Sequence, residues 1–318
     1  MRLDAVPDGP GSAALTDELE AVAHRVGRFI KRLEVDADDV ELWLNRRGTW
    51  AWRVDGRDLE ARMAPRRDTV AFRVYRDGRV GVAQANVLDE SAWQKAVQAA
   101  LGALVPDGRP LPPAPAARRP GPMTFDPELA DQLAPARALY RVASALVDNT
   151  WHEAERIPGL ARASGEVRYV VDRYVVASTA GVVASLHAHL RGHIELNGVY
   201  GDLMHQTHAP ESYLPLALLG ARTWRTMPRA HVTPADLGFT DALPVVLHPR
   251  VLEQLVRRVG PAVFDAAGRP GDQPPLTDGA EIAAPGVTLV DDPGLDGLST
   301  SRPFDDEGVP TRRTPLLV

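Results

Sequence analysis

The stretch VELWLNRRGTWAWRVDGRDLEARMA, residues 40–64, indicates the fold class through its two-residue period. Apolar side chains recur at alternate positions, which is typical of strands that bury one face. We expect turns at Arg47–Gly48 and at Asp55–Gly56, of which the second is a strong hairpin signal. The stretch TVAFRVYRDGRVGVAQAN (residues 69–86) continues the alternation through a turn at Asp77–Gly78. Together these stretches predict an antiparallel meander.

Helical periodicity flanks the meander on both sides. Thr16 is the expected N-cap of an amphipathic helix that runs to Leu33, and Asp89 opens a second helix that ends near Leu104. A helix, a meander and a second helix make an α+β domain, which we place at residues 13–104. The preceding residues 1–12 are rich in Gly and Pro and are expected to form a flexible leader.

Further α+β elements follow a proline-rich segment. Residues 105–125 are expected to be a semi-rigid linker, because dense proline favours extended chain. Residues 126–235 predict a middle α+β domain with a helix after Asp126, two long strands within residues 166–196 that turn at 179–181, and a helix at residues 212–230. Residues 236–318 predict a partial, β-rich C-terminal domain. The fold class expected is therefore α+β, with antiparallel sheets and flanking helices in two N-terminal domains plus an incomplete C-terminal domain.

The C-terminal domain is expected to begin with a strand at residues 244–247 and a helix at residues 249–259, followed by a strand at residues 286–290. It ends in DDPGLDGLSTSRPFDDEGVPTRRTPLLV, residues 291–318. Its prolines and glycines exclude a long helix, and three consecutive carboxylates can pair with two guanidiniums across a tight loop. On chemistry alone, a solvated charged loop is the ordinary interpretation.

The composition excludes several classes of protein. The 318 residues carry a net charge of −6 and no cysteine, with 44% apolar and 25% charged residues. We therefore expect no nucleic-acid partner, no disulfide and no thiolate chemistry. No apolar run is long enough to span a membrane and no signal pattern opens the chain, so we expect a cytoplasmic protein without membrane partners.

Histidines supply the candidate metal ligands. His187 and His189 are two residues apart on an expected strand and so share one face, with His193 nearby. A metal site formed by these three residues and ordinary strand histidines without metal are both compatible with this pattern. His152–Glu153 begins like a zinc helix, but neither Arg156 nor Ile157 can supply the second ligand.

Four stretches in order resemble the TldD/PmbA family. They are AFRVYRDGRVGVAQANVLDESAWQKAVQAAL (71–101), VVASTAGVVASLHAHL (175–190), LPVVLHPRVLEQLV (243–256) and SRPFDDEGVPTRRTPLL (301–317). The likeness is nearer to the PmbA (TldE) branch. It implies a cytoplasmic metallopeptidase built from two related subunits, of which the TldD type carries an HExxxH zinc helix and the PmbA type does not.

This sequence lacks that zinc helix. The helix after residues 244–247 has Arg257 and Arg258 near the place of the motif, and cations there would repel zinc. The resemblance therefore implies no catalytic residue, no metal ligand and no cofactor in this chain, with zinc expected in a TldD-like partner.

The leading hypothesis is a non-catalytic, metal-free subunit that pairs with a TldD-like zinc metallopeptidase in peptide or protein processing. Peptide substrate would contact the C-terminal loop. A stand-alone peptide-binding or scaffold protein is the alternative, and an independent metalloenzyme using the histidines is a third. Relative to the family, the chain stops early, so we expect an unfilled sheet edge after residue 314 that associates with a partner or with a second copy. The expected substrate-binding residues are Arg302, Asp305, Asp306, Glu307, Arg312 and Arg313.

Overall fold

The computed structural model divides the chain into two compact units, which are described separately. The first unit comprises residues 1–227 and 293–312, and the second comprises residues 228–292 and 313–318. The structure describes residues 6–107, 124–154, 163–196, 199–204, 222–225, 247, 249–264, 283–295 and 300–317.

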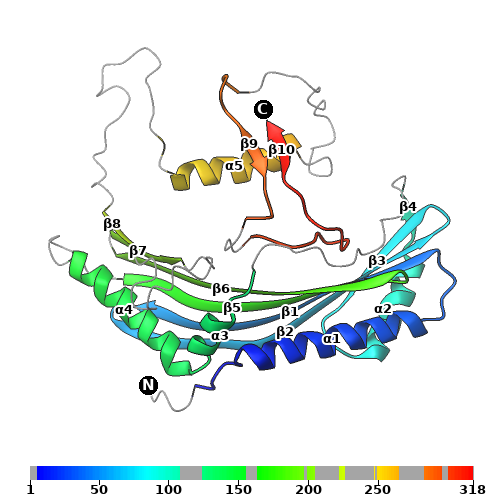
Figure 1. Ribbon diagram of the computed structural model, residues 1–318, viewed down its shortest axis with the longest axis horizontal. Coiled ribbons are helices and arrows are strands. Elements are labelled where there is room, and N and C mark those ends of the chain that lie inside the picture. Colours follow the sequence, from blue (N-terminus) through cyan, green and yellow to red (C-terminus); the bar gives the residue numbers. More distant parts are fainter. Residues whose placement is uncertain are drawn as a thin grey trace. The chain divides into compact units, whose positions relative to one another are not determined.

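An eight-stranded antiparallel sheet dominates the first unit, with the order β4-β3-β2-β1-β5-β6-β7-β8 (Figure 1). The long strands at its centre are β1 and β2 from the first meander and β5 and β6 from the second. The bounds are β1 Asp39–Asp55, β2 Asp58–Arg76, β3 Arg79–Ala85, β4 Val105–Pro106, β5 Ala163–Ser178, β6 Gly181–Leu196, β7 Val199–Met204 and β8 Arg222–Arg225.

The sheet joins the two segments that were expected to form separate α+β domains. Strand β1 pairs with β5 along its length, from Leu42 opposite Ala177 to Asp55 opposite Ser164. This pairing crosses more than a hundred residues of sequence, and neither meander has a sheet of its own. The expectation of separate antiparallel sheets in two N-terminal domains is therefore wrong, whereas the α+β class with flanking helices is confirmed.

Turn predictions succeed at the hairpins and fail inside β1. Gly56, Asp77 and Gly78 all have positive φ, as tight hairpin turns require. At Arg47–Gly48 the chain does not turn. Instead the β1–β2 register shifts between Arg47 and Thr49. Gly48 therefore lies at an irregularity of the strand pairing, and β1 continues through it.

Four helices cover one side of the sheet, here called the helix face (Figure 1). Their apolar sides bury a core with the alternate residues of the strands, including the fully buried Trp52, Phe72 and Trp93. The indole N–H of Trp93 donates to the Val87 carbonyl at 2.9 Å, so this buried donor is satisfied. The bounds are α1 Ser12–Arg32, α2 Glu90–Gly102, α3 Pro127–Leu133 and α4 Ala136–Ala154.

Helix caps agree with the sequence for two helices and disagree for α1. Asp89 and Asp126 accept hydrogen bonds from Ala92 and Leu129 and cap α2 and α3. Helix α1 begins at Ser12 with Gly11 as its N-cap, so Thr16 lies inside the helix and bonds back to Ser12.

The residues before α1 are not a loose leader where the structure describes them. Gly9 donates its N–H to Ala134 at 2.6 Å, and the Asp8 carboxylate accepts from the Ala136 N–H at 2.8 Å. The described part of residues 1–12 is thereby fastened to the start of α4, and the expectation of a flexible leader is wrong for it.

The second unit contains α5 (Pro249–Phe264) and a two-stranded sheet of β9 (Leu289–Asp291) and β10 (Thr314–Leu317). The expected helix at 249–259 and a terminal strand are confirmed. The strand expected at 244–247 lies largely outside the described residues. Residues 222–225 form β8 of the first unit, so this part of the helix expected at 212–230 is wrong. Among the described helices, none is long and apolar enough to cross a membrane.

Candidate functional site

The side of the sheet opposite the helices carries a row of polar side chains on its central strands. Because side chains alternate along a strand, the residues between the core positions of β1, β5 and β6 share this side. We call it the polar face. Its central residues are Trp43, Asn45, Arg47, Asp172, Tyr174, Ser185, His187 and His189.

The strand register places these residues in two adjacent rows. Asn45 lies opposite Tyr174, which lies opposite Ser185, so three strands contribute to one row. In the next row Arg47 lies opposite Asp172, which lies opposite His187. The rows form one continuous polar surface across β1, β5 and β6.

Tyr174 is at the centre of this surface. Its ring lies 5.0 Å from the His187 ring in an edge-on arrangement and 6.1 Å from Trp43, measured between centroids. The guanidinium carbon of Arg302 lies 5.0 Å from the Tyr174 ring centroid, which is a cation–π distance. Burial, with help from the Asp172 carboxylate, raises the pKa of Tyr174. Tyr174 is therefore a neutral aromatic platform at physiological pH.

Charges in the second row compensate each other. The Arg47 guanidinium donates to both oxygens of Asp172, at 2.7 and 3.0 Å, in a bidentate pair. The bond to Asp172 is the main cause of the raised pKa of Arg47. Burial, followed by the Arg302 charge, lowers the pKa of His187 to about 4, and burial also lowers the pKa of His189. Both imidazoles are neutral at pH 7.

The described residues 300–312 of the segment that completes the first unit contact the polar face. Besides Arg302, its Glu307 accepts from Arg73 of β2 at 3.3 Å. Arg73 also pairs with Glu41 at 2.7 Å, and the Tyr75 hydroxyl donates to Glu41 at 3.2 Å. Burial raises the pKa of Glu41 despite the nearby Arg73. These contacts attach the segment to the face at two points.

A tight turn organises the charged part of that segment. The Asp305 side chain accepts from the backbone N–H groups of Glu307 and Val309, at 2.9 and 3.0 Å, and Gly308 has a φ of 77°. Asp306 pairs with Arg302 at 2.7 Å. Asp305 thus shapes the turn, while the next two carboxylates, Asp306 and Glu307, form ion pairs with Arg302 and Arg73.

The expected substrate-binding residues are divided between the two units. Arg302, Asp306 and Glu307 lie beside the polar face, whereas Arg313 belongs to the second unit and pairs with Asp292 at 3.4 Å. Arg313 therefore pairs with a carboxylate that precedes the loop, and the expected pairing with the carboxylates at 305–307 is wrong for this residue. Arg312 is exposed.

The histidines fall on the polar face. His187 and His189 share that face of β6 as predicted, and His193 follows at the same alternation opposite Glu166. Within the described residues, no group of three His, Cys, Asp or Glu side chains could hold a metal ion.

Sequence reasoning missed several residues of this surface, chiefly Asn45, Arg47, Asp172, Tyr174 and Ser185. A signal was present, because polar residues alternate with apolar residues in the strands that contain them. That alternation marks a polar face, but it does not reveal which strands are neighbours.

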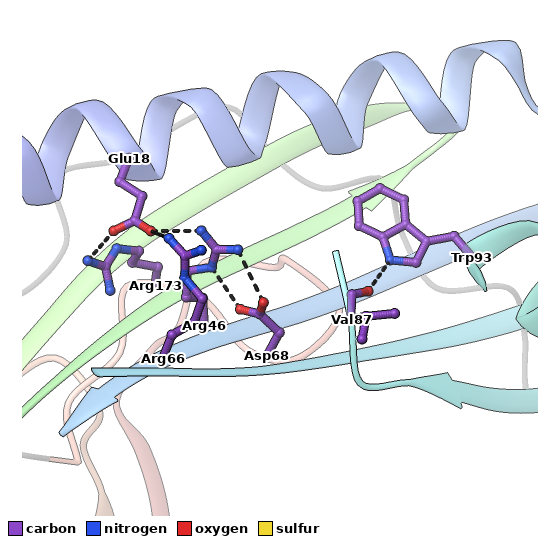
Figure 2. Close-up of polar contacts among 7 residues, drawn as sticks. All are labelled: Glu18, Arg46, Arg66, Asp68, Val87, Trp93 and Arg173. Carbon is purple, nitrogen blue, oxygen red and sulfur yellow. Dashed lines mark hydrogen bonds and ion pairs between the residues drawn. The ribbon is translucent and has the colours of Figure 1, made fainter. Parts of the chain in front are cut away.

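A second charged cluster lies on the helix face (Figure 2). Glu18 of α1 accepts from Arg46 at 2.7 Å, from Arg66 at 3.1 Å and from Arg173, while Arg46 also donates to Asp68 at 2.7 Å. Burial alone would raise the pKa of Glu18, but the three guanidiniums, Arg173 foremost, outweigh it and the pKa is lowered. This cluster fastens α1 to the sheet.

An open groove of about 500 Å³ runs beside that cluster. Its polar lining comes from Glu18, Arg25, Arg46 and Arg66, all of which have ion-pair partners. Because these charges are compensated, the groove is a weaker candidate site than the polar face.

Residues 240–318 match the family model described as the PmbA/TldA metallopeptidase C-terminal domain. This part of the chain is therefore similar to the C-terminal domain of the PmbA/TldD family. No curated protein sequence matches the chain. The similarity to the family model covers the part of the chain that contains α5, β9, β10 and the Asp305 turn.

Solved structures agree with this fold over most of the chain. TldE from Thermococcus kodakarensis is 18% identical, with a TM-score of 0.52 over 96% of this chain and 67% of that one. A protein from Thermotoga maritima described as a modulator of DNA gyrase is 17% identical, with a TM-score of 0.54 over 95% and 68%. A protein from Bacteroides thetaiotaomicron with a similar description is 14% identical, with a TM-score of 0.57 over 95% and 70%. At these identities the likeness shows the fold alone.

Zinc, which the PmbA/TldD family implies, does not fit the described residues of this chain. The sequence has neither an HExxxH motif nor a cysteine. On α5, Arg257 and Arg258 are exposed and Arg257 pairs with Glu253 at 2.9 Å, so this helix presents cations rather than metal ligands.

Proposed function

We propose that this chain is a non-catalytic, metal-free subunit of the PmbA (TldE) type, which pairs with a TldD-like zinc metallopeptidase in peptide or protein processing. The observation that carries the proposal is a metallopeptidase-family C-terminal domain at residues 240–318 in a sequence without the motif that would hold zinc. The partner supplies zinc and the hydrolytic chemistry. The pair acts in the cytoplasm.

This subunit contributes binding surface. Arg302, Asp306 and Glu307 stand beside the polar face with their charges balanced by neighbours, and Asp305 holds the backbone of the turn. The turn supplies polar contacts to an extended peptide, and Arg312 and Arg313 add positive charge nearby in sequence.

Co-expression with a TldD-like protein encoded in the same genome tests the pairing. We expect the two chains to elute together on size exclusion and the peptidase activity of the partner to rise when this chain is present. A partner whose motif glutamate is replaced by glutamine is the control, and it should bind this chain without hydrolysing peptide. If the two chains elute separately and the peptidase activity of the partner is unchanged, the proposal is contradicted.

Substitutions in the turn test the substrate contact in that complex. Asp306→Asn and Arg312→Ala should raise KM with little change in kcat, because they remove binding contacts and leave the partner's zinc site intact. Arg28→Ala, on the exposed side of α1, is the matched control and should leave both constants unchanged. Unchanged KM in both turn variants would remove the turn from the substrate path.

A further inference from the structure

Three polar atoms on the polar face are shielded from solvent and have no hydrogen-bond partner among the described residues. They are Asn45 Oδ1, Ser185 Oγ and His187 Nε2. His187 is only 7% exposed. Burying a polar group without a partner is costly, so a cluster of such groups indicates a binding site rather than a structural element.

The three atoms belong to neighbouring positions of the sheet. Asn45 and Ser185 occupy the same row on either side of Tyr174, and His187 follows two residues after Ser185 on β6. Adjacent strands lie about 4.8 Å apart and residues two apart on a strand lie about 6.6 Å apart. The cluster therefore spans about 7–12 Å, which corresponds to two to four residues of extended chain.

The helix face differs in this respect. Its unpartnered atoms, on Trp52, Tyr169 and Arg173, lie in the packed core. Trp52 packs against Tyr140 of α4, and Arg173 already donates to Glu18 of α1. The polar face lies nearer the surface, because Asn45, Ser185 and Trp43 keep partial exposure and the Arg47 side chain is 48% exposed. The three atoms themselves are covered, so a ligand reaches them only when a covering group such as the partly exposed Arg302 side chain moves away from Tyr174.

The chemistry of the polar face favours an uncharged ligand. Arg47 is paired with Asp172, and Arg302 with Asp306, so these two pairs carry no net charge beside the three atoms. An amide carbonyl oxygen, a hydroxyl and a neutral imidazole offer both donors and acceptors. The rings of Tyr174 and Trp43 supply the apolar floor that small-ligand sites usually have.

We propose that Asn45, Ser185 and His187 form a binding site for two to four residues of uncharged, extended peptide main chain. Asn45 accepts from a peptide N–H, and Ser185 and His187 bond to the neighbouring main-chain groups. Arg302, stacked on Tyr174, closes the site from the side of the 293–312 segment. The inference rests on the proposed function in taking a peptide as the ligand, but it requires no partner subunit.

An NMR titration of the full chain alone tests this site. The probe is an acetylated and amidated tetrapeptide of alanine and glycine, and the signal is the His187 ring nitrogen in histidine-labelled protein. We expect this signal to move with added peptide and Ser185→Ala to weaken binding about three- to tenfold, the effect of losing one neutral hydrogen bond.

His187→Gln should retain more affinity than His187→Phe, since glutamine still offers a polar end. An ester replacing one peptide N–H should bind more weakly than the amide.

Thermal unfolding without peptide separates a binding role from a structural one. Ser185→Ala removes an unpartnered buried hydroxyl, so its Tm should stay the same or rise. Thr150→Val is the matched control, since it deletes a buried hydroxyl that donates to Leu146 at 2.7 Å, and it should lower the Tm without affecting peptide binding.

Two results would overturn the inference. One is a His187 signal that does not move at millimolar capped peptide. The other is a Ser185→Ala variant with lowered Tm and undiminished binding, which would mean that ordered water satisfies the cluster. Either result leaves the proposed pairing standing if the two subunits co-elute, and peptide binding without co-elution would leave the inference standing alone.

Discussion

Arg46 and Arg47 are consecutive residues of β1, yet they point to opposite faces of the sheet and meet different surroundings. Arg46 is nearly buried under α1, where its donors reach Glu18 and Asp68. Arg47 is half exposed on the polar face and forms a bidentate pair with Asp172. The helix face uses charge to hold a helix, whereas the polar face leaves polar groups available beside balanced charges. The same residue type therefore serves structure on one side and recognition on the other.

Arg46→Ala should cause the largest loss of stability. It leaves Asp68, whose side chain is 10% exposed, without its guanidinium partner and weakens the attachment of α1. Breaking a buried pair in this way costs about 3–5 kcal/mol. Urea unfolding measures the loss, with Arg53→Ala on the exposed part of the same strand as control. A loss as small as that of the control would mean that the cluster does not hold α1.

Arg47→Ala should cost less, about 1–3 kcal/mol, the penalty of leaving one buried polar group unsatisfied. Asp172 loses both hydrogen bonds, but water can enter where the exposed arginine stood. The same unfolding experiment measures the difference between the two variants. Equal losses of unfolding free energy from Arg46→Ala and Arg47→Ala would contradict the idea that charges contribute more to stability on the helix face than on the polar face.

Glu18 and Glu41 should give opposite pH dependences. The pKa of Glu18 is lowered in the folded chain, so its contribution is present above its unfolded value of 4.5 and is lost as pH falls through the folded pKa. The pKa of Glu41 is raised, so the unfolded state deprotonates first and stability falls as pH rises from 4.5 through the folded pKa.

Unfolding free energies between pH 3 and 7 compare Glu18→Gln and Glu41→Gln with the parent chain. Glu18→Gln should reduce the part of the unfolding free energy that rises with pH. Glu41→Gln should reduce the part that falls with pH. Slopes changed in the same direction by both variants would contradict the assigned environments.

Arg302→Ala should have the smallest effect on stability, about 0.5–1 kcal/mol, because its ion pair with Asp306 and its stacking on Tyr174 are both partly exposed. The substitution should have a larger effect on the access of solvent to the polar face. Hydrogen exchange in β5 and β6 near Tyr174 and His187 should increase when the arginine is removed. Unchanged exchange would mean that Arg302 does not close the polar face.

The sequence predicted most features that depend on near neighbours. Alternation identified the long strands, Asp–Gly pairs located the hairpin turns, and Asp89 and Asp126 were placed at the starts of helices. Local signals also misled, because Gly48 produces an irregularity within β1 instead of a turn. A neighbouring strand on each side of β1 keeps its backbone bonds in place and overrides the turn preference of the glycine.

By itself, the sequence determined the α+β class, most of the long helices and strands before residue 197 and the lack of a zinc motif, because each depends on residue type and short-range spacing. Only the tertiary structure decided that β1 and β5 are neighbours. That pairing places Asn45, Tyr174 and Ser185 in one row and brings Arg47 to Asp172, 125 residues away. Backbone hydrogen bonds between strands are the same for any sequence, so packing of the whole sheet against its helices selects the partner strand and with it the site.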